Sequence, residues 1–326
     1  MKIVTQRRYG GPEVLEIQDV PKPVPGPNQV LIRVEAFTVT LADTAFRKAD
    51  PFIIRLFAGF LRPKSPVLGS DIGGVVEAIG AGVTRFKVGD AVFGSVGTSL
   101  GGAAEYVCLP DTAAIIQRPA GLDAGEAAGM SYSFLTALPF LRDEGQVRPG
   151  DHVLINGASG SIGAMAVQLA RHFGAEVTGV CSGRNGALVQ SLGANHVIDY
   201  TKADFTQADN GYDVIFDAVG KSSFARSKRA LKPGGIYLTT VLSPAIFWQM
   251  LTTHRSARRA RLATTGLRPV ADKLADMALL RDLIVAGVVR AVVDRRYRLS
   301  EVADAHRYVD TERKAGDVVV ELSPAG

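Results

Sequence analysis

The stretch HVLINGASGSIGAMAVQLARHFG, residues 152–174, decides the fold of this chain of 326 residues. A strand of buried type at 152–157 leads into a turn with Gly157, Gly160 and Gly163, and the helix that follows, at 161–174, ends at Gly174. Glycines at this spacing let the backbone approach a pyrophosphate, and the helix N-terminus offers N–H groups and a partial positive charge. A merely tight strand–helix turn does not need three glycines, so the stretch predicts a dinucleotide site.

Strand and helix patterns alternate beyond this turn. Short apolar runs predict strands, and residues 184–194, after the strand at 175–181, have the pattern of a helix. Such alternation predicts a doubly wound parallel sheet with helices on both faces. The further elements are strands at 175–181, 196–200, 212–220 and 234–241 and a helix at 184–194.

The first third of the chain has a different pattern, with short β-branched or aromatic runs bounded by Gly, Pro and Asp. The pattern changes near residue 122, where Asp123 is a candidate N-cap for a helix. Strand character returns in the last forty residues. We therefore predict an α/β protein in which 1–122 and 290–326 form a β-rich domain and 123–289 form the dinucleotide-binding domain.

The composition narrows the class of protein. The net charge is +5, with Lys and Arg spread along the chain, which favours anionic ligands over nucleic acid. The basic run Arg255–Arg261 has no interleaved aromatic residues, so no nucleic-acid partner is predicted.

Cys108 and Cys181 are predicted to be free thiols, and the five histidines are scattered, so no metal ion is predicted. No apolar run approaches the roughly 20 residues that span a bilayer, so we predict no membrane span and a cytoplasmic protein.

The segment VTGVCSGRN, residues 177–185, indicates which dinucleotide binds. A carboxylate at the end of this strand would hold the ribose hydroxyls of NAD and repel a 2′-phosphate. Ser182 and Arg184 stand there instead, and both can bind a phosphate, while Tyr200 could close the same pocket. The alternative for Arg184 is a solvated charge at a helix start, where a cation is slightly unfavourable. We therefore predict NADPH as the cofactor.

Further motifs follow in a defined order along the chain. PVLGSDIGGVVEAIGAGVTRFKVGDAVFG (66–94) precedes NGASGSIG and VCSGRN, and LGANHVIDY, YDVIFDAVGK, LKPGGIYL and AHRYVDTERKAGDVVVEL follow. With these motifs the chain resembles, over nearly its whole length, the zinc-independent, quinone oxidoreductase-like branch of the medium-chain dehydrogenase/reductase family. The motifs are specific for the family and much less specific for the substrate.

The resemblance implies a Rossmann domain and a GroES-like catalytic domain built from both chain ends, usually in a homodimer. It also implies no zinc, because segment 38–43 lacks the ligand cysteine of zinc-dependent relatives and Ser70 stands where their ligand histidine follows a glycine. Thr40 replaces an asparagine that zinc-free relatives commonly carry, so the resemblance does not define the substrate pocket at this position. Residues 243–268 are predicted to be a subunit contact, with a membrane-surface or lipid-quinone contact as the alternative.

The candidate site residues fall into three groups. The catalytic candidates are Thr40, Asp43 and Tyr132, although Asp43 could instead accept backbone N–H groups and Tyr132 could be a packing residue. Phe46 and Phe52 are predicted to line the substrate pocket. The predicted cofactor-binding residues are Thr136, Ser159, Gly160, Ser161, Ile162, Ser182, Arg184, Asn185, Tyr200, Ala218 and Thr240.

Together with these residues, the resemblance implies an NADPH-dependent, zinc-free oxidoreductase that transfers a hydride to a quinone or an α,β-unsaturated carbonyl compound. Binding would align the reactants, and a hydroxyl or backbone N–H would stabilise the developing oxyanion. Two alternatives stay open: an NADP-dependent alcohol dehydrogenase or carbonyl reductase, and a non-catalytic NADPH-binding redox sensor, because a fold and its chemistry are separable.

Overall fold

The computed structural model describes residues 1–97 and 100–322. The chain forms two compact units: one contains 1–132, 268–285 and 290–326, and the other contains 133–267 and 286–289. The division predicted from the sequence differs from this one at 123–132 and at 268–285. Both of these segments lie in the first unit.

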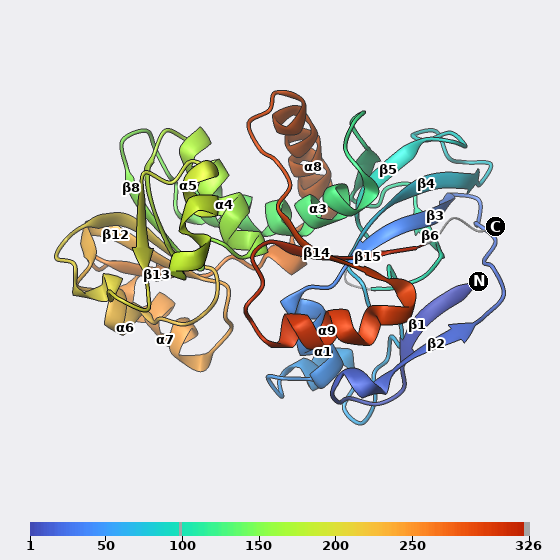
Figure 1. Cartoon of the computed structure of the whole chain (residues 1–326), viewed down its shortest axis with the longest axis horizontal. Coiled ribbons are helices and arrows are strands. Elements are labelled where there is room, and N and C mark those ends of the chain that lie inside the picture. Colours follow the sequence, from blue (N-terminus) through green and yellow to red (C-terminus); the bar gives the residue numbers. More distant parts are fainter. Residues whose placement is uncertain (98–99, 323–326) are drawn as a thin grey trace. The chain divides into compact units, whose positions relative to one another are not determined.

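The first unit is built around a sheet with the strand order β14-β15-β3-β4-β5-β7, in which β6 also pairs with β3. Both ends of the chain contribute to it, because β15 lies antiparallel to β3; Figure 1 shows the red β14 and β15 beside the blue β3. A separate antiparallel pair contains β1 and β2. The strands are β1 (Lys2–Gln6), β2 (Leu15–Asp19), β3 (Gln29–Thr38), β4 (Asp71–Ile79), β5 (Ala91–Ser95), β6 (Tyr106–Pro110), β7 (Ile115–Gln117), β14 (Val293–Arg298) and β15 (Asp317–Glu321).

The core of this unit is made by alternating apolar residues of the strands. Ile32, Phe37 and Ile72 are almost fully buried, and Val318 of β15 packs into the same cluster. Burial of each such side chain stabilises the fold by about 1.5–3 kcal/mol. The helices are η1 (Pro12–Val14), α1 (Leu41–Lys48), α2 (Ile54–Ala58), α8 (Val270–Val285), η6 (Leu299–Glu301) and α9 (Val302–Asp310).

The second unit contains a wholly parallel sheet with the order β10-β9-β8-β11-β12-β13. This confirms the predicted doubly wound sheet. The strands are β8 (His152–Asn156), β9 (Glu176–Cys181), β10 (His196–Asp199), β11 (Tyr212–Asp217), β12 (Leu231–Thr239) and β13 (Arg259–Arg261). The helices are η2 (Pro139–Glu144), α4 (Ser161–His172), η3 (Gly183–Asn185), α5 (Gly186–Ser191), η4 (Phe205–Gln207), α6 (Phe224–Ser227), α7 (Pro244–Thr253) and η5 (Thr265–Leu267).

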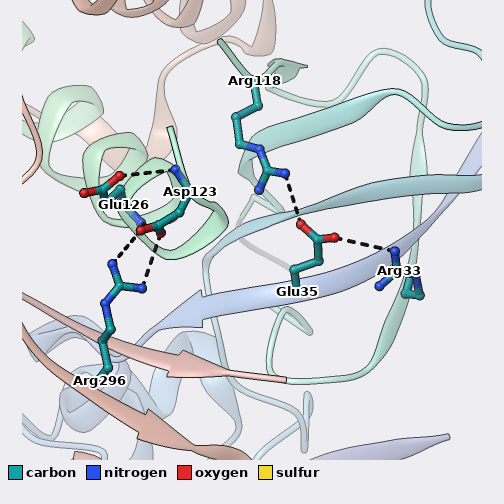
Figure 2. A network of polar contacts seen from close by, with 6 residues as sticks. All are labelled: Arg33, Glu35, Arg118, Asp123, Glu126 and Arg296. Atoms are coloured by element: carbon teal, nitrogen blue, oxygen red, sulfur yellow. Dashed lines mark hydrogen bonds and ion pairs between the residues drawn. The ribbon is translucent and has the colours of Figure 1, made fainter. Parts of the chain in front are cut away.

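Helix α3 (Ala124–Leu138) begins in the first unit and ends in the second, with the boundary after Tyr132. Asp123 precedes it and forms the predicted cap: the Glu126 N–H donates to Asp123 Oδ1 over 2.8 Å, and the Asp123 N–H donates to Glu126 Oε2 over 3.2 Å. Arg296 of β14 holds the same carboxylate through Nη2 at 2.6 Å, as Figure 2 shows. The start of α3 is therefore tied to the C-terminal strands.

A second set of ion pairs links β3 to the residue after β7. Glu35 accepts from Arg118 Nη2 at 3.1 Å and from Arg33 Nη2 at 3.5 Å (Figure 2). Partly exposed pairs of this kind contribute at most about 1 kcal/mol each, so they orient the strand ends more than they stabilise the unit. Across 1–97 and 100–322, no helix is both long and apolar enough to cross a membrane.

Candidate functional site

The parallel sheet reverses its strand order between β8 and β11, because β9 lies on one side of β8 and β11 on the other. In open α/β sheets a ligand binds at the carboxyl ends of the strands at this reversal. Asn156 ends β8 and Asp217 ends β11, in register with each other. Asn156 Nδ2 donates to Asp217 Oδ1 over 2.9 Å, which fixes the two strand ends together.

Asp217 organises the loop that follows β11. Its carboxylate is fully buried and accepts from the Gly220 N–H at 2.9 Å, the Ser222 N–H at 2.8 Å and the Tyr237 hydroxyl at 3.0 Å. Burial, followed by the charge of Asp217, raises the pKa of Tyr237, so its phenol keeps its proton and donates. Asp217 therefore satisfies donors from three segments and shapes the edge where a ligand would bind.

The glycine turn after β8 fits a pyrophosphate. Gly157 has φ +82°, a conformation that favours glycine, and a Cβ added at Gly163 would lie 2.1 Å from the Gly157 carbonyl oxygen. Gly160 has neither restriction: its φ is −75°, and an added Cβ would meet only that same oxygen, at 3.5 Å, among the described residues outside its own chain neighbours. Internal packing therefore does not require glycine at 160, whereas a phosphate that approaches the backbone would. Gly160 is also the N-cap of α4, whose N-terminus favours an anion.

The predicted 2′-phosphate residues lie at the ends of neighbouring parallel strands. Ser182 follows β9 and is partly buried, Arg184 is exposed in η3, and Tyr200 follows β10 with 62% of its surface exposed. Asn185 links this turn to the glycine turn, because its Nδ2 donates to Ser159 Oγ over 3.0 Å. The structure thus brings these predicted residues to one edge of the second unit.

The structure also places a carboxylate that the sequence reasoning missed at this edge. Asp199 is in register with Cys181, the last residue of β9. Hydrogen bonds from the Thr201 hydroxyl and N–H, and a weaker contribution from the Gly183 N–H, hold the pKa of Asp199 below its usual value. The Asp199 carboxylate therefore already accepts hydrogen bonds from Thr201 and from the turn at Gly183.

Ser161 and Ile162 begin α4, and the remaining predicted cofactor residues lie in α3 and after β11 and β12. The Thr240 hydroxyl donates to the Ala218 carbonyl oxygen over 3.3 Å, which joins the ends of β11 and β12 at the same edge as the glycine turn. Thr136 lies in the part of α3 that belongs to the second unit and is partly buried.

In the first unit, the predicted catalytic residues Thr40 and Asp43 form the capping box at the start of α1. Asp43 Oδ2 accepts from the Thr40 N–H at 2.8 Å and from the Thr40 hydroxyl at 2.6 Å, and Asp43 Oδ1 accepts from the Gly69 N–H at 3.1 Å. Burial raises the pKa of Asp43, and these hydrogen bonds oppose the rise. Both oxygens are engaged, so the geometry favours the structural alternative for Asp43, in which it positions α1 against the segment at Gly69.

Tyr132 comes close to this pair. Its pKa is raised, first by burial and then by the charges of Asp43 and Asp71, while a hydrogen bond with Thr40 lowers it. The phenol therefore stays protonated at neutral pH and is able to donate. Of the two predicted pocket residues, Phe46 is partly buried on α1, the same helix as Asp43. Phe52, 62% exposed, packs edge-on against Phe60 with ring centroids 6.0 Å apart.

A buried acid that the sequence reasoning missed lies next to Ser70. Asp71 is 2% exposed, and its Oδ2 is 2.6 Å from Ser70 Oγ. Burial, with smaller contributions from the charges of Asp43 and Asp317, raises the pKa of Asp71 to about 8, although the hydrogen bond with Ser70 and the charge of Lys273 oppose the rise. The only sequence signal was an acidic residue at the start of a mostly apolar strand, DIGGVVEAI.

No group of three or more His, Cys, Asp or Glu side chains within 1–97 and 100–322 could hold a metal ion. Cys108 lies in β6 of the first unit and Cys181 at the end of β9 in the second.

Known proteins match this chain in sequence and in fold. The family described as the alcohol dehydrogenase GroES-like domain matches residues 26–120, and the one described as zinc-binding dehydrogenase matches residues 192–320. A quinone oxidoreductase of Pseudomonas aeruginosa is 31% identical over 96% of this chain and 97% of its own length. The chloroplastic NADPH-dependent alkenal/one oxidoreductase of Arabidopsis thaliana is 31% identical over 98% of this chain and 79% of its own length.

Among solved structures, the quinone oxidoreductase from Coxiella burnetii has a TM-score of 0.87 at 30% identity and covers 98% of this chain and 99% of its own. The matches in sequence and in fold extend over nearly the whole chain, and the two families match one part of it each. It follows that the chain belongs to the medium-chain dehydrogenase/reductase family, in its quinone oxidoreductase-like branch, and that it is an oxidoreductase.

Proposed function

We propose that this chain uses NADPH to reduce a quinone or an α,β-unsaturated carbonyl compound, without a metal ion. The observation that carries the proposal is the free space at Gly160, where an added Cβ would meet no close neighbour among the described residues. Gly160 lies at the strand reversal of the parallel sheet, beside Ser182, Arg184 and Tyr200. Relatives named for quinone reduction and for alkenal and alkenone reduction support the substrate class.

The described residues fit the dinucleotide in three places. The glycine turn and the N-terminus of α4 would bind the pyrophosphate through backbone N–H groups. Ser182, Arg184 and Tyr200 would bind the 2′-phosphate. Ala218 and Thr240, at the ends of β11 and β12, would border the dinucleotide at the same edge. When bound, NADPH supplies a hydride to an electron-poor carbon of the substrate.

The preference for NADPH over NADH is proposed from the chemistry of the turn after β9. Ser182 and Arg184 can both donate to a phosphate, and an Arg–phosphate contact is commonly bidentate. The negative charge of Asp199 would oppose a phosphate, but this carboxylate already accepts from Thr201 and Gly183. We therefore propose that Arg184 decides the preference.

Charge reversal at Arg184 tests this preference. We expect Arg184→Glu to raise the Kd for NADPH by about 100-fold, because a charge-assisted contact worth about 1.5–3 kcal/mol becomes a repulsion. The Kd for NADH should change little, because NADH has no 2′-phosphate. Both constants are measured by fluorescence titration. Lys228→Glu makes the same change in charge at an exposed residue after α6 and should leave both constants unchanged. An equal loss for both cofactors in Arg184→Glu would contradict the proposal.

On the substrate side, Tyr132 is the proposed hydroxyl donor, and Thr40 and Asp43 are proposed to position it. The Thr40 hydroxyl donates to Asp43 over 2.6 Å, which fixes its orientation, and the raised pKa of Tyr132 keeps its proton on the phenol. A protonated phenol can stabilise a developing enolate or quinol oxyanion through a hydrogen bond. Phe46 and Phe52 are proposed to contact an apolar substrate.

The proposed reaction is tested by NADPH oxidation at 340 nm with a panel of ortho-quinones, para-quinones and enones. We expect turnover with at least one of these classes. A protein that binds NADPH and turns over a saturated ketone or aldehyde but none of the panel would be a carbonyl reductase. Tight NADPH binding without turnover of any acceptor would favour the redox sensor. The homodimer and the cytoplasmic location stay predictions.

A further inference from the structure

Two hydroxyl–carboxyl pairs lie side by side in the first unit. The Thr40 hydroxyl contacts Asp43 Oδ2 at 2.6 Å, and the Ser70 hydroxyl contacts Asp71 Oδ2 at 2.6 Å. The Gly69 N–H joins them, because it precedes Ser70 and donates to Asp43 Oδ1 over 3.1 Å. Thr40 is only 3% exposed, whereas Ser70 is partly exposed. Of the two hydroxyls, Ser70 is therefore the one that a substrate can reach.

Ser70 is held firmly by the neighbouring strand. Its carbonyl oxygen accepts from the Val96 N–H at 2.8 Å and from the Ser95 hydroxyl at 3.1 Å. Gly69 packs against Ala103 so closely that an added Cβ would lie 2.5 Å from the Ala103 nitrogen. The fold thus fixes the backbone of Ser70, and the contact with Asp71 orients its hydroxyl, as proton transfer to a bound substrate requires.

The surroundings of Asp71 favour its neutral form. Asp71 Oδ1 is buried and has no hydrogen-bond partner among the described residues. Three other elements place charges around it: Asp43 comes from α1, Asp317 from β15 and Lys273 from α8. Two neighbouring carboxylates and one ammonium group together disfavour a negative charge on Asp71. The buried, unpartnered Oδ1 atom makes the charged form of Asp71 still less favourable.

Resting on the reductase function proposed above, we propose that Ser70 and Asp71 deliver the proton that completes reduction. After hydride transfer the substrate carries an enolate or quinol oxyanion. An O–H bond forms on this oxygen as the Ser70 O–H bond breaks, and Ser70 Oγ takes the proton of the Asp71 carboxylic acid. Asp71, left as a carboxylate, regains a proton from water before the next turnover. One hydride and one proton are thereby added to the substrate.

The geometry of the pair permits this relay without any movement of the backbone. When Asp71 is neutral, its Oδ2–H can donate to Ser70 Oγ over the same 2.6 Å. This arrangement leaves the Ser70 hydroxyl proton available to the substrate oxygen. Tyr132 can stabilise the oxyanion from α3, but Asp71 is the group whose pKa, raised to about 8, holds a transferable proton at neutral pH.

Steady-state rates against pH test the relay. In the wild type the acid is active in its protonated form, so kcat for an enone or a quinone should fall as the pH rises through about 8. Asp71→Asn and Ser70→Ala should lower kcat by about 100-fold and lose this descending limb. Ser70→Thr, which keeps a hydroxyl, should retain the limb. A descending limb that persists in Asp71→Asn would overturn the proposal.

Two substitutions that keep Asp71 make the test independent of any folding defect in Asp71→Asn. Lys273→Met removes the cation that favours the carboxylate, so the limb should move to higher pH. Asp317→Asn removes a neighbouring negative charge, so the limb should move to lower pH. Asp272→Asn removes an exposed carboxylate from the same helix as Lys273 and should leave the profile unchanged. If neither Lys273→Met nor Asp317→Asn moves the limb, the relay is wrong.

The protonation of Asp71 can also be followed in the protein without cofactor or substrate. Infrared difference spectra of wild type against Asp71→Asn should show a carboxylic acid band that disappears with a midpoint near pH 8. A midpoint near the ordinary value of about 4 would overturn the relay and leave the reductase function intact. Absence of turnover with the whole acceptor panel, with the midpoint near 8, would instead contradict the reductase function.

Discussion

Gly160→Ala is expected to weaken NADPH binding by about 100-fold while the second unit stays folded. The added Cβ would lie 3.5 Å from the Gly157 carbonyl oxygen, an ordinary van der Waals contact, and the φ of −75° suits alanine. The same Cβ would occupy the space through which a pyrophosphate approaches the N-terminus of α4. A loss of about 2.7 kcal/mol in binding corresponds to the expected factor of 100. Isothermal titration measures the affinity, and thermal unfolding measures the stability.

Gly163→Ala is the matched control, because it tests the same turn for packing instead of binding. Its Cβ would lie 2.1 Å from the Gly157 carbonyl oxygen and 2.9 Å from Ala158 Cα, so the backbone must move. We expect Gly163→Ala to lower the free energy of unfolding by about 1–3 kcal/mol. Gly160→Ala should lose no more than about 1 kcal/mol, the cost of alanine at an N-cap. Unchanged NADPH affinity in a folded Gly160→Ala protein would remove the glycine turn from the cofactor site.

Asp217→Asn is expected to lower the free energy of unfolding of the second unit by about 3 kcal/mol or more. The carboxylate accepts from Asn156 Nδ2 and the Gly220 N–H at Oδ1, and from the Ser222 N–H and the Tyr237 hydroxyl at Oδ2. Whichever way the asparagine amide is turned, its NH₂ group faces two of these donors. Each donor left without an acceptor costs about 1–3 kcal/mol in a buried place. Chemical denaturation measures the change.

The control for Asp217 is an exposed aspartate of the same unit. Asp209 pairs with Arg229 at the surface, where water replaces a lost partner, so Asp209→Asn should leave the denaturation midpoint unchanged. The loop 218–222 depends on Asp217, so Asp217→Asn should also weaken NADPH binding if Ala218 borders the cofactor. A midpoint in Asp217→Asn equal to that of the wild type would show that the Asp217 hydrogen bonds are not needed for stability.

Local patterns in the sequence were enough to predict the elements around the glycine turn. The expected strand at 152–157 is β8, the expected helix at 161–174 is α4, and the expected strand at 175–181 is β9. The apolar periodicity and the glycines that decide these elements lie within a few residues of each other along the chain. No distant contact is therefore needed to predict them. The cap at Asp123 was predictable for the same reason, because Asp123 and Glu126 are three residues apart.

The candidate site was predictable only in part. Thr40 and Asp43 are near neighbours on the chain, and their pairing follows from the capping box alone. The link from Asn185 to Ser159 depends on the parallel pairing of β8 and β9, which the predicted alternation of strands and helices implies. Asp199 escaped notice although its neighbour Tyr200 was considered, because the sequence alone does not show that Asp199 lies in register with Cys181 at the end of β9.

The sequence by itself determined the parallel sheet, the glycine turn and the family, because these depend on residue types repeated at short, regular spacings. The tertiary structure alone decided the environments of Asp217 and Asp71. Asp217 meets donors from β8, β12 and its own loop, and Asp71 lies among charges from α1, α8 and β15. A pKa and a hydrogen-bond network depend on burial and on neighbours far apart along the chain. No local pattern encodes those distances, so folding had to bring the groups together first.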